Sequence, residues 1–397
     1  MEMFFVSSNA RIGFVIAEEN SGWMGGKNYL INLMQSVSEL ADRRIETVLF
    51  VPPNIDPVFV SQFPVDQVVH TRMVHRRGIR RILGVVARRL LGRDFTLEWL
   101  GRSHCIDRFS HIASAGRFSP VKVMTWIPDF QHIHLPDFFS EQECARRDAA
   151  YATAANESFR VILSSHAALA DFISIHPDAA ARSRVVQFVS NAGGARQSTP
   201  LVELAEKYDL CGAYFHVPNQ LWKHKNHWVI IEALALLCAR GTTVTIVCTG
   251  DTLDYRHPEF FEELKAHIAA CGVVDSFRIL GLVPYADVTG LMRHATAVIN
   301  PSLFEGWSTA VEEAKSLGKC VLLSDIPVHR EQAPPRGIFF RPNDASALAD
   351  ALLQTLHGYD VQNEQQQFEF AQTKLAQRFK DFGKVYQQVC LDQQFCP

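Results

Sequence analysis

Short apolar runs alternate with helical segments along this chain, and the alternation occurs twice. The first series has apolar runs at residues 12–17, 47–51, 122–127, 160–163 and 184–189. The second series has apolar runs at residues 214–217, 244–249, 277–280, 297–299 and 320–323, and helical patterns at 227–239, 257–270, 309–317 and 345–356. Because consecutive parallel strands need a crossover, which is usually a helix, this alternation predicts an α/β fold with two parallel sheets.

A polar stretch with two adjacent glycines separates the two series. Residues 191–200 read Asn-Ala-Gly-Gly-Ala-Arg-Gln-Ser-Thr-Pro, a composition typical of a linker. We expect a first domain at residues 1–195, a second at residues 196–375, and a C-terminal helix at residues 376–397 that packs back toward the first domain. Two doubly wound domains joined in this way predict a ligand cleft at the carboxyl ends of their strands.

The composition is that of an ordinary globular protein and favours no nucleic-acid partner. The net charge is −3, so the chain as a whole does not attract nucleic acid. The nine cysteines include no Cys-x-x-Cys pair, which favours reduced thiols in the cytoplasm. We see no secretory signal at the N-terminus and no apolar stretch of the ~20 residues that a membrane span needs. We therefore expect a cytoplasmic protein.

One basic segment stands apart from this average. Residues 72–93, from Arg72 to Arg93, carry eight arginines and no acidic residue, and their apolar residues would lie on one face of a helix. A basic amphipathic helix of this kind predicts peripheral contact with an anionic membrane surface. A solvated face or an acidic protein partner would explain the same pattern.

Two carboxylates surround the start of a predicted helix in the second domain. Glu305 lies in the preceding loop, and Glu313 lies eight positions later, inside the helix. Free N–H groups at a helix start bind anions, most often phosphate. A carboxylate beside such a helix start suggests a ligand with both phosphate and hydroxyl groups, such as a nucleotide sugar. Thr309 and Glu312 fit a capping box, so we assign Glu312 a structural role.

Basic residues follow the first predicted strand of the second domain. Lys223 and Lys225 lie where that strand ends, and cations there can neutralise a diphosphate leaving group. His224 and His227 have a spacing that some metal ligands share. However, no carboxylate accompanies them within a turn, and the chain contains neither His-Glu-x-x-His nor Asp-x-Asp. We therefore predict no metal site.

The first domain has two candidate segments at strand ends. Asp129, His132 and His134 are expected in the loop after residues 122–127, where acid–base or hydroxyl-orienting groups would lie, although capping and packing are alternatives. Gly25 and Gly26 are expected in a loop between the first strand and its helix, where phosphate often binds. That loop matches neither the dinucleotide fingerprint nor the P-loop, and a simple turn is the alternative.

Together these segments resemble retaining glycosyltransferases of the GT-B fold, specifically glycosyltransferase family 4. The resemblance covers nearly the whole chain. It is strongest at residues 299–318, where Glu305 and Glu313 match the family's E-x7-E signature. Residues 280–284 resemble the family's loop beside the nucleotide base, and residues 324–331 and 339–344 resemble the segments that usually follow the signature. It implies the GT-B fold, in which two Rossmann-like, doubly wound domains face each other across a cleft.

The resemblance also implies roles for the matched residues. Glu313 would hold the ribose hydroxyls, Glu305 would contact the transferred sugar, and Lys225 would bind the donor diphosphate. The N–H groups of residues 308–310 would bind the distal phosphate. The substrate-binding residues implied besides these three are Gly25, Gly26, Gln220, Lys223, Val283, Pro284, Gly306, Trp307, Ser308, Thr309 and Ala310.

The chain departs from the family pattern at two places. Asn219 and Gln220 stand where an arginine usually precedes the lysine, and Lys223 is a candidate replacement. Pro128 stands where many members have a histidine before Asp129. We prefer His132 as the substitute for this acceptor-side histidine and keep His134 as the alternative.

The resemblance implies a metal-independent retaining glycosyltransferase that needs no cofactor, with Glu305, Lys225, Asp129 and His132 as catalytic residues. It would move a sugar from a nucleoside diphosphate sugar to a hydroxyl of a glycan or lipid-linked acceptor, in cell-surface polysaccharide or glycolipid assembly at the inner membrane face. The alternatives are a GT-B-fold nucleotide-sugar epimerase or phosphorylase, and a non-catalytic glycan-binding partner subunit. The base, the sugar, the acceptor and the oligomeric state are left open.

Overall fold

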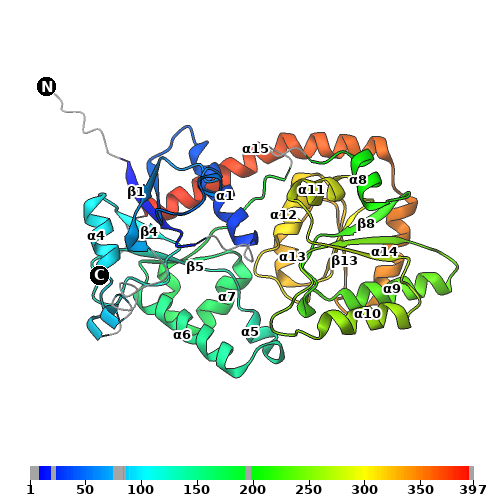
Figure 1. Cartoon of the computed structure of the whole chain (residues 1–397), viewed down its shortest axis with the longest axis horizontal. Helices are drawn as coiled ribbons and strands as arrows, with labels where there is room; N and C mark the ends of the chain where they lie inside the picture. The colour runs from blue at the N-terminus through cyan, green and yellow to red at the C-terminus, as the bar shows by residue number, and fades with distance from the viewer. Residues whose placement is uncertain are drawn as a thin grey trace. The chain divides into compact units, whose positions relative to one another are not determined.

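The computed structural model (Figure 1) describes residues 9–18, 24–74, 84, 86–88, 90–192 and 198–392. They form two compact units. Unit 1 comprises Met1–Asp129, Ala145–Phe188 and Arg378–Pro397, and unit 2 comprises Phe130–Cys144 and Val189–Gln377. Residues 75–83, 85 and 89 of the predicted basic helix and residues 193–197 of the predicted linker lie outside the described residues.

Unit 1 contains a seven-stranded sheet in the order β3-β2-β1-β4-β5-β6-β7. Every neighbouring pair is parallel. The central strands are almost fully buried, as expected for a parallel sheet with helices on both faces. The strands are β1 (Ala10–Val15), β2 (Ile45–Val51), β3 (Gln67–His70), β4 (Arg108–Ser110), β5 (Val123–Ile127), β6 (Arg160–Leu163) and β7 (Ser183–Val185).

The helices of unit 1 begin at polar caps where the sequence supplies them. Asp94 caps α4 by accepting hydrogen bonds from the N–H groups of Thr96 and Leu97, and Ser165 caps α7 by accepting one from Ala168. The helices are α1 (Met24–Ser38), α2 (Pro57–Val60), α4 (Phe95–Ser103), α7 (His166–Ile175) and most of α6 (Glu141–Glu157). The short 3-10 helices are η1 (Arg72–Val74) and η3 (Pro177–Arg182).

The last helix of the chain, α15 (Val361–Leu391), contributes to the core of unit 1 through its final turns. Tyr386 is fully buried and donates a hydrogen bond to Ser110. Gly383 allows this close packing, because a Cβ there would lie 2.3 Å from the carbonyl oxygen of Ser36 in α1. The helix thus extends from Val361, before residue 376, and its last residues, from Arg378, belong to unit 1. The division of the chain into the three predicted parts stays a prediction.

Unit 2 contains a six-stranded parallel sheet in the order β10-β9-β8-β11-β12-β13. Counted within the unit, this is the order 3-2-1-4-5-6 of a doubly wound Rossmann-type sheet. The strands are β8 (Tyr214–Val217), β9 (Thr245–Thr249), β10 (Phe277–Gly281), β11 (Val298–Asn300), β12 (Val321–Ser324) and β13 (Gly337–Phe340).

Two layers of helices cover the sheet of unit 2. In Figure 1, α9 and α10 run along one side of the sheet, and α11 and α12 lie on the other. The largest apolar cluster fills the space under α9, α10 and α14, and two smaller clusters lie under α8, α11 and α12. The helices are α5 (Gln131–His134), α8 (Leu201–Tyr208), α9 (His227–Ala239), α10 (Phe260–Ala270), α11 (Tyr285–His294), α12 (Thr309–Ser316), α13 (Pro327–Gln332) and α14 (Ala345–His357), with the 3-10 helices η2 (Pro136–Phe138) and η4 (Lys223–Lys225).

The predicted α/β fold is confirmed, with one doubly wound parallel sheet in each unit. Two local predictions are wrong. Gly25 and Gly26 lie in the first turn of α1 instead of a loop, and His132 and His134 lie in the short helix α5 instead of a loop. The facing of the two domains across a cleft stays a prediction.

Candidate active site

A buried ion pair joins the loops after β8 and β11 of unit 2. Lys225 ends η4, which follows β8, and Glu305 lies in the loop after β11. The Nζ of Lys225 lies 2.6 Å from Oε1 of Glu305. The side chain of Lys225 is 15% exposed, and that of Glu305 is 10% exposed. β8 and β11 are neighbours at the point where the strand order reverses, which is where doubly wound sheets bind ligands. The structure therefore brings two of the predicted catalytic residues together at the edge suited to a ligand.

The surroundings of Glu305 keep its carboxyl ionised. Burial raises the pKa of Glu305, but the charge and hydrogen bond of Lys225 and the hydroxyl of Ser302 lower it by more, so that the pKa lies below its ordinary value. His329 of α13 is also buried, and burial lowers its pKa, which keeps the ring neutral. The site therefore presents one ionised carboxylate beside one lysine ammonium.

Buried amides fix the loop that carries Glu305. Asn300, at the end of β11, donates from Nδ2 to the hydroxyl of Ser308 at 2.7 Å, and its Oδ1 lies 2.7 Å from the hydroxyl of Ser302. Asn219 donates to the same Oδ1 at 3.3 Å. These four side chains are buried. Asn219, one of the two residues at the family's arginine position, therefore contributes to holding the loop in place.

Close packing also shapes the strand-end loop that contains Gln220. Gly250 follows β9 with a φ of 144°, and a Cβ there would lie 2.5 Å from the carbonyl oxygen of Asn219. The N–H of Leu221 donates to the carbonyl of Asp251 at 2.8 Å. The half-buried Gln220 thus lies between backbone segments whose spacing depends on a glycine.

The start of α12 offers two N–H groups to a ligand. Ser308 is the N-cap, and its hydroxyl accepts a hydrogen bond from the N–H of Val311. The N–H of Ser308 donates to Oε1 of Gln332 at 3.2 Å, so it is not available to a phosphate. Within the described residues, the N–H groups of Thr309 and Ala310 have no acceptor. Of the three predicted phosphate-binding N–H groups, the last two are therefore available.

The predicted capping box at Thr309 is wrong, although its conclusion for Glu312 holds. Because Ser308 is the cap, Glu312 lies one position beyond the box position. Glu312 is buried and accepts hydrogen bonds from Lys315 at 2.9 Å and from Gln332 at 3.1 Å. It therefore fixes α12 against α13, which is a structural role.

Glu313 points to a tyrosine that the sequence reasoning missed. The hydroxyl of Tyr285, the first residue of α11, donates to Oε1 of Glu313 at 2.6 Å. Tyr285 directly follows Val283 and Pro284, the loop predicted to lie beside the base, and Glu313 is 5% exposed. The position of Tyr285 after a predicted base loop was the available signal. The contact links that loop to the predicted ribose ligand.

The segment Phe130–Cys144 belongs to unit 2, although it follows a strand of unit 1. His134 stacks on Phe304, the residue before Glu305, with ring centroids 5.0 Å apart. Arg256 donates to Oε1 of Gln131 at 3.0 Å and to Nδ1 of His224 at 3.2 Å. The predicted acceptor-side histidines therefore lie in a segment that contacts the strand-end loops of unit 2.

The other candidates in this region occupy different surroundings. Lys223 is exposed, and its Nζ lies 5.3 Å from the ring centroid of Phe138. Its side chain thus contacts the segment Phe130–Cys144. His132 is buried and lies edge-on to Phe139. Asp129 belongs to unit 1, where its carboxylate lies 3.3 Å from Nη1 of Arg147. Asp129 and His132 therefore belong to different units.

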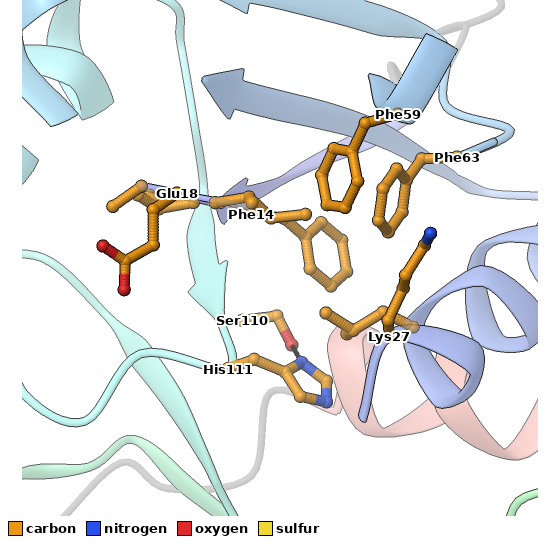
Figure 2. A pocket seen from close by; sticks show the side chains of 11 residues that line it. Phe14, Glu18, Lys27, Phe59, Phe63, Ser110 and His111 are labelled. Atoms are coloured by element: carbon orange, nitrogen blue, oxygen red, sulfur yellow. Dashed lines mark hydrogen bonds between the residues drawn. The ribbon is translucent and has the colours of Figure 1, made fainter. Parts of the chain in front are cut away.

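Unit 1 has a cavity of about 280 Å³ at its own strand-order reversal, between β1 and β4 (Figure 2). Figure 2 shows the rings of Phe14, Phe59 and Phe63 around it, with Lys27 reaching in from α1 and Glu18 on the opposite side. The Nζ of Lys27 lies 4.9 Å from the ring centroid of Phe59. The cavity is thus mostly apolar, with three phenylalanine rings and with two charged groups at its margins. The predicted residues Gly25 and Gly26 lie in the helical turn just before Lys27.

A strained histidine closes one side of this cavity. His111 follows β4 with a φ of 62°, in the left-handed region that costs a non-glycine residue energy. Its Nδ1 lies 2.8 Å from the hydroxyl of Ser110, and its Nε2 lies 2.8 Å from the hydroxyl of Tyr29. Burial lowers the pKa of His111 to about 3, so the ring is neutral. Sequence reasoning missed His111, because the short strand before it, β4, was not predicted either.

Among the residues that the structure describes, no three His, Cys, Asp or Glu side chains gather in a way that could hold a metal ion. His224 and His227 are both buried, and burial lowers the pKa of each. Within the same described ranges, no helix combines the length and apolar character needed to cross a membrane.

Comparison with known proteins identifies a family model and several relatives that are similar to parts of this chain. Residues 212–372 match the model of the family described as glycosyl transferases group 1. One relative is the GDP-mannose:cellobiosyl-diphosphopolyprenol alpha-mannosyltransferase of Komagataeibacter xylinus, 28% identical over 175 residues, which are 42% of this chain and 43% of that protein. Another is the O-antigen chain mannosyltransferase B of Escherichia coli, 34% identical over 79 residues, or 20% of this chain and 21% of that protein. The chain thus spans less than half the length of these curated relatives.

Solved structures resemble the chain over nearly its full length. Anabaena HepE in complex with UDP-glucose has a TM-score of 0.67 at 18% identity and covers 96% of this chain and 98% of its own. A glycosyltransferase from Rickettsia africae has a TM-score of 0.70 at 16% identity, and the match covers 97% of this chain and 100% of that chain. WaaG, a glycosyltransferase involved in lipopolysaccharide biosynthesis, has a TM-score of 0.60 at 12% identity, and the match covers 97% of this chain and 100% of that chain. Two doubly wound sheets and this similarity show that the chain has the GT-B fold, and its residues 212–372 are similar to the glycosyl transferases group 1 family.

Proposed function

We propose that this chain is a metal-independent retaining glycosyltransferase. It transfers a sugar from a nucleoside diphosphate sugar to a hydroxyl of a glycan or lipid-linked acceptor in cell-surface polysaccharide or glycolipid assembly. The observation that carries the proposal is the buried ion pair of Lys225 and Glu305. Glu305 lies four residues before Thr309, the first residue of α12, whose N–H group has no acceptor within the described residues. This arrangement supplies positive charge for a diphosphate and a carboxylate for a sugar at one edge of the sheet of unit 2.

The chemistry follows from these charges. As the bond between the sugar C1 and the phosphate oxygen breaks, negative charge grows on the leaving diphosphate. The ammonium of Lys225 and the N–H groups of Thr309 and Ala310 stabilise that charge without a metal ion. The acceptor oxygen forms the new bond to C1 on the same face, and its proton goes to the leaving phosphate. Glu305 orients the sugar and stabilises the developing positive charge near C1.

The base and ribose have their own candidate groups. Glu313 accepts from the ribose hydroxyls, and the hydroxyl of Tyr285 at 2.6 Å holds this carboxylate in place. The loop with Val283 and Pro284 lies beside the base. The complex of Anabaena HepE with UDP-glucose supports a nucleotide-sugar ligand for this fold.

On the acceptor side, we assign the cavity of unit 1 to part of the acceptor. The rings of Phe14, Phe59 and Phe63 suit the apolar face of a sugar or a lipid segment, and Lys27 suits an anionic substituent. The Komagataeibacter relative, a cellobiosyl-diphosphopolyprenol mannosyltransferase, supports a lipid-linked acceptor. His132 and Asp129 are the proposed hydroxyl-orienting residues, and the cytoplasmic membrane face is the proposed location.

The experiment begins with thermal unfolding of the chain in the presence of UDP, GDP and ADP. A nucleotide at about 100 times its dissociation constant adds ~2.7 kcal/mol of stability, which identifies the base. Sugar transfer from the matching nucleotide sugars is then measured, and the anomeric configuration of the product is read by NMR. We expect a retained configuration, unchanged activity with EDTA, and loss of transfer in Glu305→Gln.

The control variant for this experiment is Lys319→Met, which breaks a buried ion pair with Glu364 outside the site. It should reduce stability but leave transfer intact. Inversion at C1, a metal requirement or full activity of Glu305→Gln would contradict the mechanism. Turnover of the nucleotide sugar without any acceptor would instead indicate an epimerase.

A further inference from the structure

His329 is a fully buried histidine that the proposed transfer reaction does not yet use. It lies on α13, which follows β12 at the same edge of the sheet as Lys225 and Glu305. Its Nδ1 lies 2.8 Å from the carbonyl oxygen of Ser324, the last residue of β12. Because a carbonyl oxygen only accepts, Nδ1 carries the proton of the neutral ring, and Nε2 holds a lone pair.

The lone pair on Nε2 of His329 is buried and has no hydrogen-bond partner among the residues that the structure describes. Buried polar atoms in native proteins nearly always have a partner, so this exception needs an explanation. A lone pair on a buried imidazole either accepts a hydrogen bond or takes up a proton. Since none of the ring is exposed to a ligand, a proton is the partner that fits without displacing the packing.

Two serines connect His329 to Glu305. The hydroxyl of Ser324 donates to the carbonyl of Ser302 at 2.6 Å, and the hydroxyl of Ser302 donates to Oε1 of Glu305 at 2.7 Å. The same Oε1 accepts a hydrogen bond from Nζ of Lys225. His329 thus holds the residue that supports the loop of Glu305.

Two charges from other elements act on the ring of His329, the carboxylate of Glu305 and the ammonium of Lys225. Burial has the largest effect and lowers the pKa of His329, while the carboxylate raises that pKa and the ammonium lowers it. Departure of the ammonium would therefore raise the pKa of the ring. Other charged groups on and next to α12 and α13 have partners of their own, namely Glu331 and the pairs of Glu312 with Lys315 and Asp325 with Arg330.

We propose that His329 is a positioning residue for Glu305 that takes up a proton when the donor diphosphate draws Lys225 away from that carboxylate. The inference rests on the proposed function, in which Lys225 binds the diphosphate and Glu305 contacts the sugar. The proton comes from solvent and forms an N–H bond at Nε2, so that an imidazolium replaces the ammonium as the cation near the buried carboxylate. A buried carboxylate left without any cation would be strongly unfavourable. Donor binding and protonation of His329 therefore favour each other.

Calorimetry of donor binding to the full chain measures this proton. UDP-glucose, GDP-mannose and ADP-glucose are the probes, because their esterified phosphates stay ionised and do not titrate near neutral pH. Comparing the heats of binding in buffers with different enthalpies of ionisation gives the number of protons taken up. For the wild type, we expect uptake of at least about half a proton near pH 6.5, and an affinity that rises about tenfold from about pH 8 to about pH 6.

Two variants of His329 separate its hydrogen bond from its proton. The amide of His329→Asn can still donate to Ser324 from the place of Nδ1, but it has no group that takes up a proton. We expect this variant to bind the donor like the wild type near pH 8 and to show no rise in affinity toward pH 6. His329→Leu also removes the hydrogen bond, and it should weaken donor binding at both pH values.

His216 on β8 supplies a matched control. It is as buried as His329, its Nε2 lies 2.9 Å from the hydroxyl of Thr249, and its Nδ1 has no partner within the described part of the chain. His216→Gln keeps an amide near the place of Nε2 and removes Nδ1. We expect it to take up protons on donor binding as the wild type does.

Three results would overturn the proposal. One is binding of a nucleotide sugar by the wild type without proton uptake, which would leave the proposed transferase standing. Another is equal proton uptake by the wild type and His329→Asn, and the third is loss of uptake in His216→Gln as well. Failure of all three nucleotide sugars to bind would instead refute the proposed function together with this inference, so the two failures are distinguishable.

Discussion

Replacing Lys225 by methionine removes the cation of the buried pair while keeping an apolar stem of similar length. The ammonium lies 2.6 Å from Glu305, whose side chain is 10% exposed. In Lys225→Met, the carboxylate keeps the hydroxyl of Ser302 at 2.7 Å but has no adjacent lysine. Removing one partner of a buried ion pair costs about 3–5 kcal/mol. We expect the free energy of unfolding to fall by that amount at neutral pH.

The pH dependence of this loss follows from the pKa of Glu305. In the wild type that pKa is lowered, so the carboxylate contributes stability above its unfolded pKa of about 4.3 and loses it as pH falls through the folded value. In Lys225→Met, burial becomes the main influence and raises the pKa. The contribution is then present below about 4.3 and is lost as pH rises through the raised value. The difference between variant and wild type should therefore shrink toward pH 4.

Urea unfolding at a series of pH values measures this difference. Lys225→Met/Glu305→Gln should recover most of the lost stability, because no buried charge remains unpaired. Lys319→Met is the matched control, since its partner Glu364 keeps a second cation, Arg336, and should stay ionised. A loss below about 1 kcal/mol, typical of surface pairs, would refute the reasoning. So would a loss that is the same at pH 4 and pH 7.

Three further experiments probe the surrounding structure. Glu313→Gln should weaken nucleoside diphosphate binding by about 1–3 kcal/mol, as measured by calorimetry. Glu312→Gln should lower the stability of the fold without changing that affinity. Equal affinities for the two variants would contradict the assignment of Glu313 to the ribose. Gly250→Ala should lower the free energy of unfolding by more than about 2 kcal/mol, because the added Cβ would meet backbone atoms. Gly212→Ala, also at positive φ but with open space around it, should cost about 1 kcal/mol. Similar shifts in melting temperature for the two variants would argue against the close contact at Gly250. Burial lowers the pKa of His227 to about 3, so the wild type should lose stability as pH falls below about 6.5. His227→Leu should reduce the slope of unfolding free energy against pH in that range by about 1.4 kcal/mol per pH unit. An unchanged slope would contradict the lowered pKa of His227.

The sequence predicted the strands that are continuous and apolar and missed those that are not. β6 and β8 were predicted with their full limits, because their four residues each are buried without interruption. β3 was missed because it is an edge strand whose outer residues, Gln67 and His70, are exposed. β4 was missed because its three residues include a buried arginine, Arg108. Short or polar strands depend on pairing with neighbours, which local hydrophobic pattern does not report.

Local sequence also predicted where α12 begins, but not which of its N–H groups lack an acceptor within the described residues. Ser308 and Thr309 mark the start of α12, yet the N–H of Ser308 is used by Gln332, which lies 24 positions later on α13. The different roles of Glu312 and Glu313 are likewise decided by neighbours, since one binds Lys315 and the other Tyr285. Helical periodicity places adjacent residues on different faces, but only packing supplies the partners.

The sequence by itself determined the two alternating α/β series and the positions of Lys225 and Glu305 after strands, because hydrophobic period and breaker residues are local properties. Only the tertiary structure decided that those strands are neighbours at the order reversal, so that residues 80 positions apart form a buried pair. It also assigned the segment with His132 and His134 to unit 2. Contacts between distant segments are fixed by strand order and packing, which no local pattern encodes.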